Sequence, residues 1–171
     1  MLLKEYKGIT PKLVGAYVAE DASVIGDVEV GENASIWYGV VLRGDVDKIV
    51  IGANTSIQDN SVAHCAMNIP TIIGKNCVVG HNAIIHSCTV EDDCLIGMGA
   101  VLLDGCHIGA GSVVAAGAVV SPGKVIPPNS MVMGVPGKVV RQTTEKDREA
   151  TSWSVSHYIA YAEEQLPRQD A

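Results

Sequence analysis

The sequence predicts an all-β solenoid of about six coils followed by one C-terminal α-helix. Three observations predict it: an aliphatic residue recurs every six positions, glycine supplies 18 of the 171 residues, and phenylalanine is absent. A core without large aromatic anchors must be built from many small and β-branched side chains, which suit short stacked strands. The predicted domain boundaries are residues 1–141 for the solenoid and residues 142–171 for the C-terminal helical segment.

The six-residue repeat begins at Val18 and runs to Val132 with three changes of spacing. Three residues are inserted before Ile51, four are inserted before Ile73, and one step of five leads to Val90. Nineteen hexads result, and each begins with an apolar residue. A six-residue unit is too short for a helical repeat, and a flat strand would have a period of two. Three short strands per coil satisfy the repeat, with inward aliphatic side chains about 4.8 Å apart between coils.

The segment after the last hexad is predicted to leave the solenoid through a glycine- and proline-rich exit. Thr143 and Thr144 then precede the charged run 145–149, which is typical of the start of a helix. Four apolar residues follow at near-helical spacing before Pro167: Trp153, Tyr158, Ala162 and Leu166. We therefore expect one helix of about twenty residues that packs along the solenoid.

Composition excludes several classes of protein. Twelve basic against nineteen acidic residues give a formal charge of −7, which argues against binding to a nucleic-acid backbone or an anionic membrane surface. A hydrophobic fraction of 47% argues against disorder. The five cysteines form no CxxC pair, so buried thiols are expected and a disulfide framework is not. The default location is the cytoplasm.

Three of the five histidines fall into register. His64 and His86 are each second in their hexads and lie three hexads apart, so they share a column, with Arg43 one turn below. His81 is third in its hexad, one face away, with Asp59 one turn beneath it. One subunit is therefore not expected to bring all three imidazoles to one ion, whereas a neighbour around a threefold axis can supply His81. Three neutral imidazoles and one open position are typical of a catalytic zinc site.

The residues around these histidines resemble a known family. The strings are Val41-Leu42-Arg43-Gly44-Asp45, Ser56-Ile57-Gln58-Asp59-Asn60, His64, and Gly80-His81-Asn82-Ala83-Ile84-Ile85-His86. In this order they resemble the γ-class carbonic anhydrases and their close bacterial relatives, over essentially the whole chain. The resemblance implies a left-handed parallel β-helix of the hexapeptide-repeat family and reversible hydration of CO2 to bicarbonate.

The resemblance also implies a set of site residues. His64, His81 and His86 would bind the metal between subunits of a homotrimer. The metal would be Zn²⁺, although Fe²⁺ and Co²⁺ also suit imidazole ligands. The residues expected in supporting roles are Arg43, Asp45 and Asp59 as interfacial ion pairs, Arg43 also towards bicarbonate, Gln58 towards the metal-bound water, and Tyr158 above the site. Three apolar residues are available to line a small CO2 pocket: Ile57, Val62 and Met67.

One feature of the family pattern is missing. The best-studied γ enzymes carry glutamates that move the proton away from the metal site. Here Asp45 is followed by Val46, and residues 65–70 contain no acid. We therefore expect slow or buffer-dependent turnover.

Two other classes of function remain open. One is an acyl-CoA thioesterase or acyltransferase on the same scaffold, because the segment 134–138 resembles the coil exit of hexapeptide acyltransferases. Those enzymes usually carry a long catalytic loop, whereas the insertions here are three and four residues. The other is a metal-binding scaffold without turnover.

Overall fold

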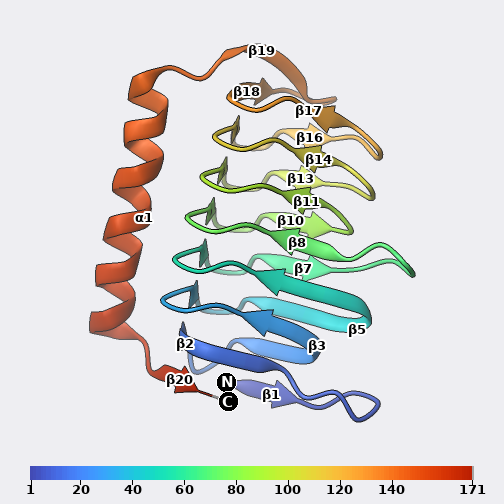
Figure 1. Ribbon diagram of the computed structural model, residues 1–171, viewed down its shortest axis with the longest axis vertical. Coiled ribbons are helices and arrows are strands. Elements are labelled where there is room, and N and C mark those ends of the chain that lie inside the picture. The colour runs from blue at the N-terminus through green and yellow to red at the C-terminus, as the bar shows by residue number, and fades with distance from the viewer. Residues whose placement is uncertain (171) are drawn as a thin grey trace.

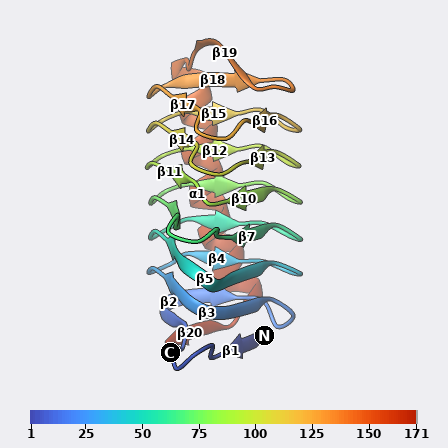
Figure 2. The ribbon, with the colours of Figure 1, turned by 90° about the vertical axis from the view of Figure 1, so that its right-hand side faces the viewer.

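The computed structural model describes residues 1–170 and is a parallel β-solenoid of about seven turns, with one long helix, α1, along its side (Figure 1). Each turn places one strand segment on each of three faces. The turns stack as level rungs, and both termini lie at the same end of the stack (Figure 2). Within residues 1–170, no helix combines the length and apolar character that a bilayer crossing requires.

Each face is a ladder of seven parallel segments. The first face contains β1 (Leu2–Lys4), the start of β3 (Ser23–Val30), the start of β5 (Val41–Ile51), β7 (Val62–His64), β10 (Ile84–His86), β13 (Val101–Leu102) and β16 (Val119–Val120). The second face contains the start of β2 (Lys12–Val18), the ends of β3 and β5, β8 (Thr71–Ile73), β11 (Thr89–Val90), β14 (His107–Ile108) and β17 (Val125–Ile126). The third face contains the end of β2, β4 (Ser35–Ile36), β6 (Ser56–Ile57), β9 (Val78–Val79), β12 (Leu95–Ile96), β15 (Val113–Val114) and β18 (Ser130–Met133).

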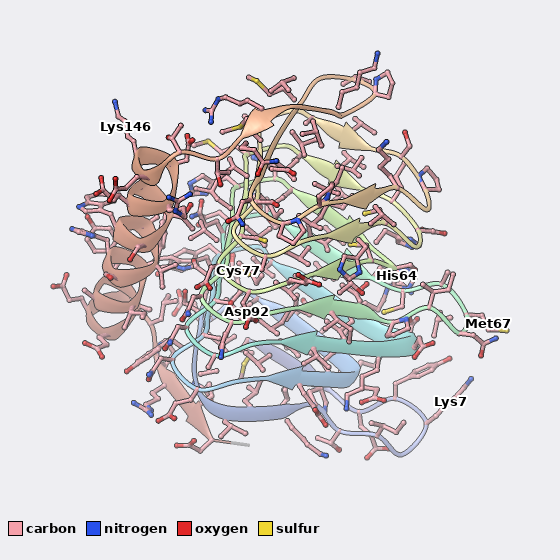
Figure 3. The ribbon with its side chains drawn as sticks, turned by 45° about the horizontal axis from the view of Figure 1, so that its top comes forward. Lys7, His64, Met67, Cys77, Asp92 and Lys146 are labelled. Carbon is pink, nitrogen blue, oxygen red and sulfur yellow. The ribbon has the colours of Figure 1, made fainter. Side chains whose placement is uncertain are left out.

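The structure confirms the predicted solenoid and adds a turn to it. The extra turn comes from residues before Val18, where Leu3 pairs with Val24 and Leu13 pairs with Val30 in parallel register. A four-residue excursion separates Leu3 from Leu13, which hides the six-residue spacing in the sequence. The same kind of excursion follows His64, so two loops protrude on the side away from α1, with Lys7 and Met67 in them (Figure 3).

The core consists of the inward-facing aliphatic residues of the strand segments, together with small residues between the strands such as Ala34 and Ala100. Along β3 the buried residues alternate with partly exposed ones, as the period of two requires. Close stacking leaves no room for side chains at some corners: a Cβ on Gly52 would lie 2.5 Å from the backbone of the next turn. All five cysteines are free and buried, as predicted.

The C-terminal segment follows the prediction and then goes beyond it. β19 (Lys138–Gln142) pairs antiparallel with β18, and α1 (Glu145–Gln165) packs on the third face over β4, β6 and β9. Thr144 is the N-cap, and its side chain accepts a hydrogen bond from the amide of Asp147. The chain then returns as β20 (Arg168–Asp170), which pairs antiparallel with β2. The sequence pattern contains no signal for this last strand.

Candidate metal centre

Three polar residues form a column at the end of the first face. In the register of β5, β7 and β10, Arg43 pairs with His64, and His64 pairs with His86. Their strand neighbours Ala63 and Ile85 point into the core, so the two imidazoles point outward. This arrangement agrees with the column expected from the repeat.

The two stacked imidazoles face one another. His64 Nδ1 lies 3.1 Å from His86 Nε2, and the ring centroids are 5.2 Å apart. The side chains are 18% and 31% exposed, so both are accessible from the surface of the subunit. A ligand between the two rings would contact one nitrogen of each.

A carboxylate contacts the other nitrogen of each ring. Asp45 Oδ1 lies 3.0 Å from His64 Nε2, and Asp104 Oδ1 lies 2.5 Å from His86 Nδ1. An ionised carboxylate only accepts hydrogen bonds, so His64 Nε2 and His86 Nδ1 are the nitrogens that carry protons. In the neutral rings, His64 Nδ1 and His86 Nε2 then each present a lone pair.

This pair of lone pairs suits a metal ion. Two unprotonated nitrogens at 3.1 Å have no proton to share, so they repel unless a cation lies between them. Two nitrogens bound to one tetrahedral zinc ion at about 2.0–2.1 Å lie roughly 3.3 Å apart, close to the separation in the structure. The donor set of His64 and His86 therefore fits a divalent metal.

His81 lies at a different corner, between the third face and the first. Its Nδ1 donates to Asp59 Oδ2 at 2.7 Å, and Asp59 lies one turn beneath it, as the repeat predicts. The hydrogen bond leaves His81 Nε2 as the unprotonated nitrogen. Within residues 1–170, no group of three or more His, Cys, Asp or Glu side chains is placed to hold a metal ion.

The acidic residues are engaged within the subunit. Arg43 Nη1 donates to Asp45 Oδ2 at 2.6 Å, so Asp45 bridges the guanidinium and His64. Burial raises the pKa of Asp45, but the hydrogen bonds from Arg43 and His64 outweigh it and hold that pKa below its usual value. Arg43, Asp45 and Asp59 thus have partners within one subunit, and their pairing across subunits stays a prediction.

Tyr158 and Gln58 lie on the His81 side of the subunit. Tyr158, on α1, packs edge-to-face on Trp37 with ring centroids 5.5 Å apart. Burial, and then the nearby charge of Asp59, raise the pKa of its phenol. Gln58 precedes Asp59 and is only 4% exposed.

The expected CO2 pocket needs one correction. Ile57 is 1% exposed and points into the solenoid core, so it does not line a surface pocket. Hexad-first residues form the core, and the repeat already places Ile57 among them. Val62 lies on the outer side of the first face, and Met67 is exposed in the loop after His64.

Asp104 is the site residue that the sequence analysis missed. It lies just after β13, one turn beyond His86, in a corner that carries no family motif. The register pairs Ile85 with Leu102, and Asp104 follows Leu102 by two residues. The position of this acidic residue one turn from a candidate ligand is the signal in the sequence that could have identified it.

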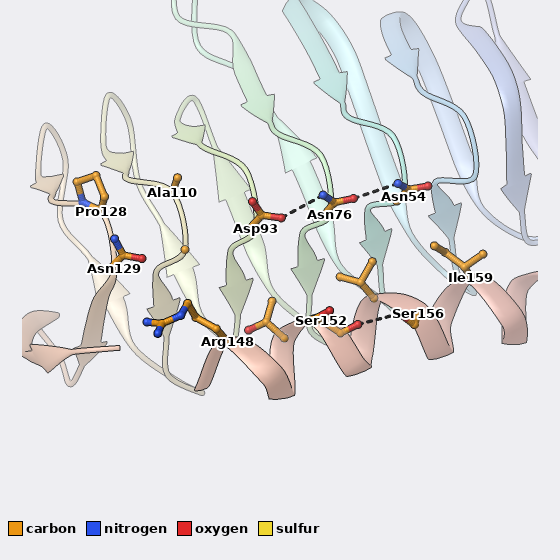
Figure 4. A pocket seen from close by; sticks show the side chains of 13 residues that line it. Asn54, Asn76, Asp93, Ala110, Pro128, Asn129, Arg148, Ser152, Ser156 and Ile159 are labelled. Carbon is orange, nitrogen blue, oxygen red and sulfur yellow. Dashed lines mark hydrogen bonds between the residues drawn. The ribbon is translucent and has the colours of Figure 1, made fainter. Parts of the chain in front are cut away.

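A cavity lies away from the histidines, between α1 and the corner that joins the second and third faces (Figure 4). Its volume is about 610 Å³. Side-chain amides line it in a ladder, in which Asn54 donates to Asn76 at 3.0 Å and Asn76 donates to Asp93 at 3.0 Å. No histidine or cysteine lines this cavity, so it has no imidazole or thiolate for a metal.

Comparison with known proteins agrees with the fold. Residues 87–122 match the family model described as bacterial transferase hexapeptide (six repeats). The chain is 53% identical over 146 residues to the probable carbonic anhydrase of Methanocaldococcus jannaschii, covering 85% of this chain and 92% of that one. It is 47% identical over 153 residues to gamma carbonic anhydrase 2, mitochondrial, of Arabidopsis thaliana, covering 86% of this chain and 55% of that longer protein.

A solved structure shows the same architecture. The putative acetyltransferase from Bacillus cereus has a TM-score of 0.94 and 40% identity to this chain, with 95% of each chain covered. This structure is named as an acetyltransferase although its sequence is also similar to this chain, whereas the two curated relatives with higher identity, 53% and 47%, are named carbonic anhydrases. The chain belongs to the γ-class carbonic anhydrase-like enzymes of the hexapeptide-repeat family.

Proposed function

We propose that the protein is a homotrimeric, zinc-dependent carbonic anhydrase with one metal site at each subunit interface. His64 Nδ1 and His86 Nε2 of one subunit and His81 Nε2 of its neighbour are the ligands. The observation that carries the proposal is the pair of lone pairs at 3.1 Å, each fixed by a carboxylate on the opposite ring nitrogen. The Asp59–His81 contact prepares the third imidazole in the same way.

The surface of the first face supports the trimer. Its outward residues form an aliphatic stripe beside the imidazole column: Val41, Val62, Ile84, Val101 and Val119. Ile84 is 44% exposed, and Met98, one turn beyond His81, is 60% exposed. A contiguous apolar surface of this kind is typical of a protein interface. Packing a second subunit against this stripe would bury it and bring the two histidine corners together.

The metal, when bound, supplies a Lewis acid that makes hydroxide available near neutral pH. The chain supplies the surroundings. Gln58, almost fully buried beside Asp59, would orient the attacking oxygen through its side-chain amide. Arg43 offers a guanidinium one turn below His64, where it can bind the bicarbonate product. Tyr158 covers the His81 side and limits access of water.

Zinc is the proposed ion, and Fe²⁺ or Co²⁺ would suit the same imidazoles. We place the trimer in the cytoplasm, because its five free, buried thiols suit a reducing compartment.

Acyl transfer is the second candidate function. The named transferase with the same fold favours it, at a TM-score of 0.94. Against it, both excursions from the solenoid are short, and the loop after His64 contains no acid or histidine that could act as a general base.

The test measures metal content and two activities on the same preparation. We expect about one zinc per chain, CO2 hydration in a stopped-flow indicator assay, loss of both in His81→Ala, and no acyl-CoA hydrolysis. Fully metallated protein that hydrolyses acyl-CoA and does not hydrate CO2 would refute the proposal. Bound zinc with neither activity would instead support a scaffold without turnover.

A further inference from the structure

We infer that Asp104 is a positioning residue that sets the metal affinity of the site by holding the ring of His86. The inference rests on the proposed metal site and adds a residue to it. His86 Nδ1 donates to Asp104 Oδ1 at 2.5 Å, and the two residues come from successive turns of the solenoid. The side chains are 31% and 45% exposed.

The backbone around Asp104 is fixed on both sides. The amide of Gly105 donates to the carbonyl of Ser87 at 2.6 Å, which ties this corner to the residue that follows His86. The carbonyl of Asp104 accepts from the amide of Gly123 at 2.8 Å, from the turn above. The backbone that carries the carboxylate is therefore ordered before any metal arrives, and the ordering of the corner is not a cost of binding.

The charge of Asp104 is directed at His86 alone. Asp45, the equivalent partner of His64, shares its charge with Arg43 at 2.6 Å. Within residues 1–170, Asp104 forms an ion pair with no lysine or arginine, and His86 is its sole side-chain partner. Of these two carboxylates, Asp104 thus gives more unshared negative charge to its imidazole and raises the basicity of the ligand.

Removal of this carboxylate allows His86 to adopt two alternative states. The ring of His86 can carry its proton on Nε2, which leaves no lone pair towards His64, or it can rotate so that Nδ1 faces the site. Metal binding must then select the productive tautomer and orientation from this mixture. Loss of such a partner typically weakens metal binding by about 10- to 100-fold.

The experiment compares Asp104→Ala and Asp104→Asn with a matched control. Glu91 and His107 form a second carboxylate–imidazole pair, at 2.7 Å on the second face, so Glu91→Gln removes the negative charge from the same kind of pair away from the site and is matched to Asp104→Asn. Zinc affinity is measured by competition with a chromophoric chelator, and the His86 tautomer is measured by ¹⁵N chemical shifts in metal-free protein.

We expect wild type to hold His86 protonated on Nδ1, Asp104→Ala to bind zinc about 10- to 100-fold more weakly with a mixed tautomer, and Asp104→Asn to lie between them. Glu91→Gln should match wild type. Zinc affinity of Asp104→Ala within twofold of wild type overturns the inference and leaves the metal site standing. His86 of wild type protonated on Nε2 overturns the inference as well, and the zinc affinity of wild type then decides the metal site separately. Wild type that binds no zinc overturns the proposed function as well, so the two failures are distinguishable.

Discussion

Mixing two inactive variants tests whether each metal site is shared between subunits. His81→Ala retains the pair of imidazoles on the first face, and His86→Ala retains His81 at the other corner. Each variant alone has only incomplete sites, and two imidazoles with water bind zinc weakly. In a mixed trimer, an interface at which one variant supplies His81 and the other supplies His64 and His86 is complete.

The magnitude follows from the symmetry of a closed trimer. When equal amounts are unfolded together and refolded, about three quarters of the trimers contain both variants. Every mixed trimer has one complete interface whichever variant is in excess, so about one quarter of all sites are restored. Zinc per chain, measured by atomic emission after removal of loosely bound metal, should rise from near zero to about one quarter of the wild-type value.

The matched control mixes His64→Ala with His86→Ala. Their imidazoles lie 3.1 Å apart in one subunit, so both variants damage the same half of the site and no arrangement completes it. We expect no zinc from this mixture. Equal recovery in both mixtures, or no recovery in the first while refolded wild type regains its metal, would refute a site split between His81 and the other two ligands.

Three further predictions concern rate, packing and pH. A diffusible base such as imidazole should raise kcat and leave kcat/KM nearly unchanged, and Val46→Glu should act likewise by up to about 10²-fold, because no acid follows Asp45 directly; a buffer-insensitive rate contradicts this. Gly52→Ala should destabilise the fold by about 1–3 kcal/mol in urea unfolding, since its Cβ would meet the backbone of the next turn. The hydrogen bond from His107 lowers the pKa of Glu91, so its stabilisation is present above the unfolded pKa of about 4.3 and is lost as the pH falls through the folded pKa. Glu91→Gln should therefore lose less stability than wild type between pH 7 and pH 3, by under about 1 kcal/mol for so exposed a pair.

Most of the fold follows from one physical constraint that can be recognised in the sequence. Each inward position must be aliphatic at every turn, so the phase of the repeat places nearly every residue on a face. The prediction fails between Leu3 and Leu13, where an insertion breaks the phase of the repeat. No further hexad lies there from which the six-residue spacing could be recognised. It also misses β20, whose pairing with β2 depends on where α1 ends rather than on a pattern in residues 168–170.

The candidate site also has some features that the repeat predicts and others that it does not. Backbone phase predicts the column of Arg43, His64 and His86, and it predicts Asp59 beneath His81, because neighbouring turns are in register. Hydrogen-bond partners depend on side-chain torsions, which the repeat does not determine. The repeat thus did not predict that Asp45 contacts His64 as well as Arg43 in its own subunit.

The geometry of a solenoid favours the proposal that a site of three imidazoles is shared between chains. Successive turns are about 4.8 Å apart, which lets two stacked rings bring one nitrogen each to a common ion. A third residue in the same column lies about 9.6 Å from the first, beyond the reach of that ion. Here the third position is Arg43, a cation that cannot be a ligand and instead binds Asp45. Two ligands are thus what one column supplies, and the third must come from another corner. Since His81 lies at a separate corner of its own chain, association with a neighbour is the step that would complete the proposed metal site.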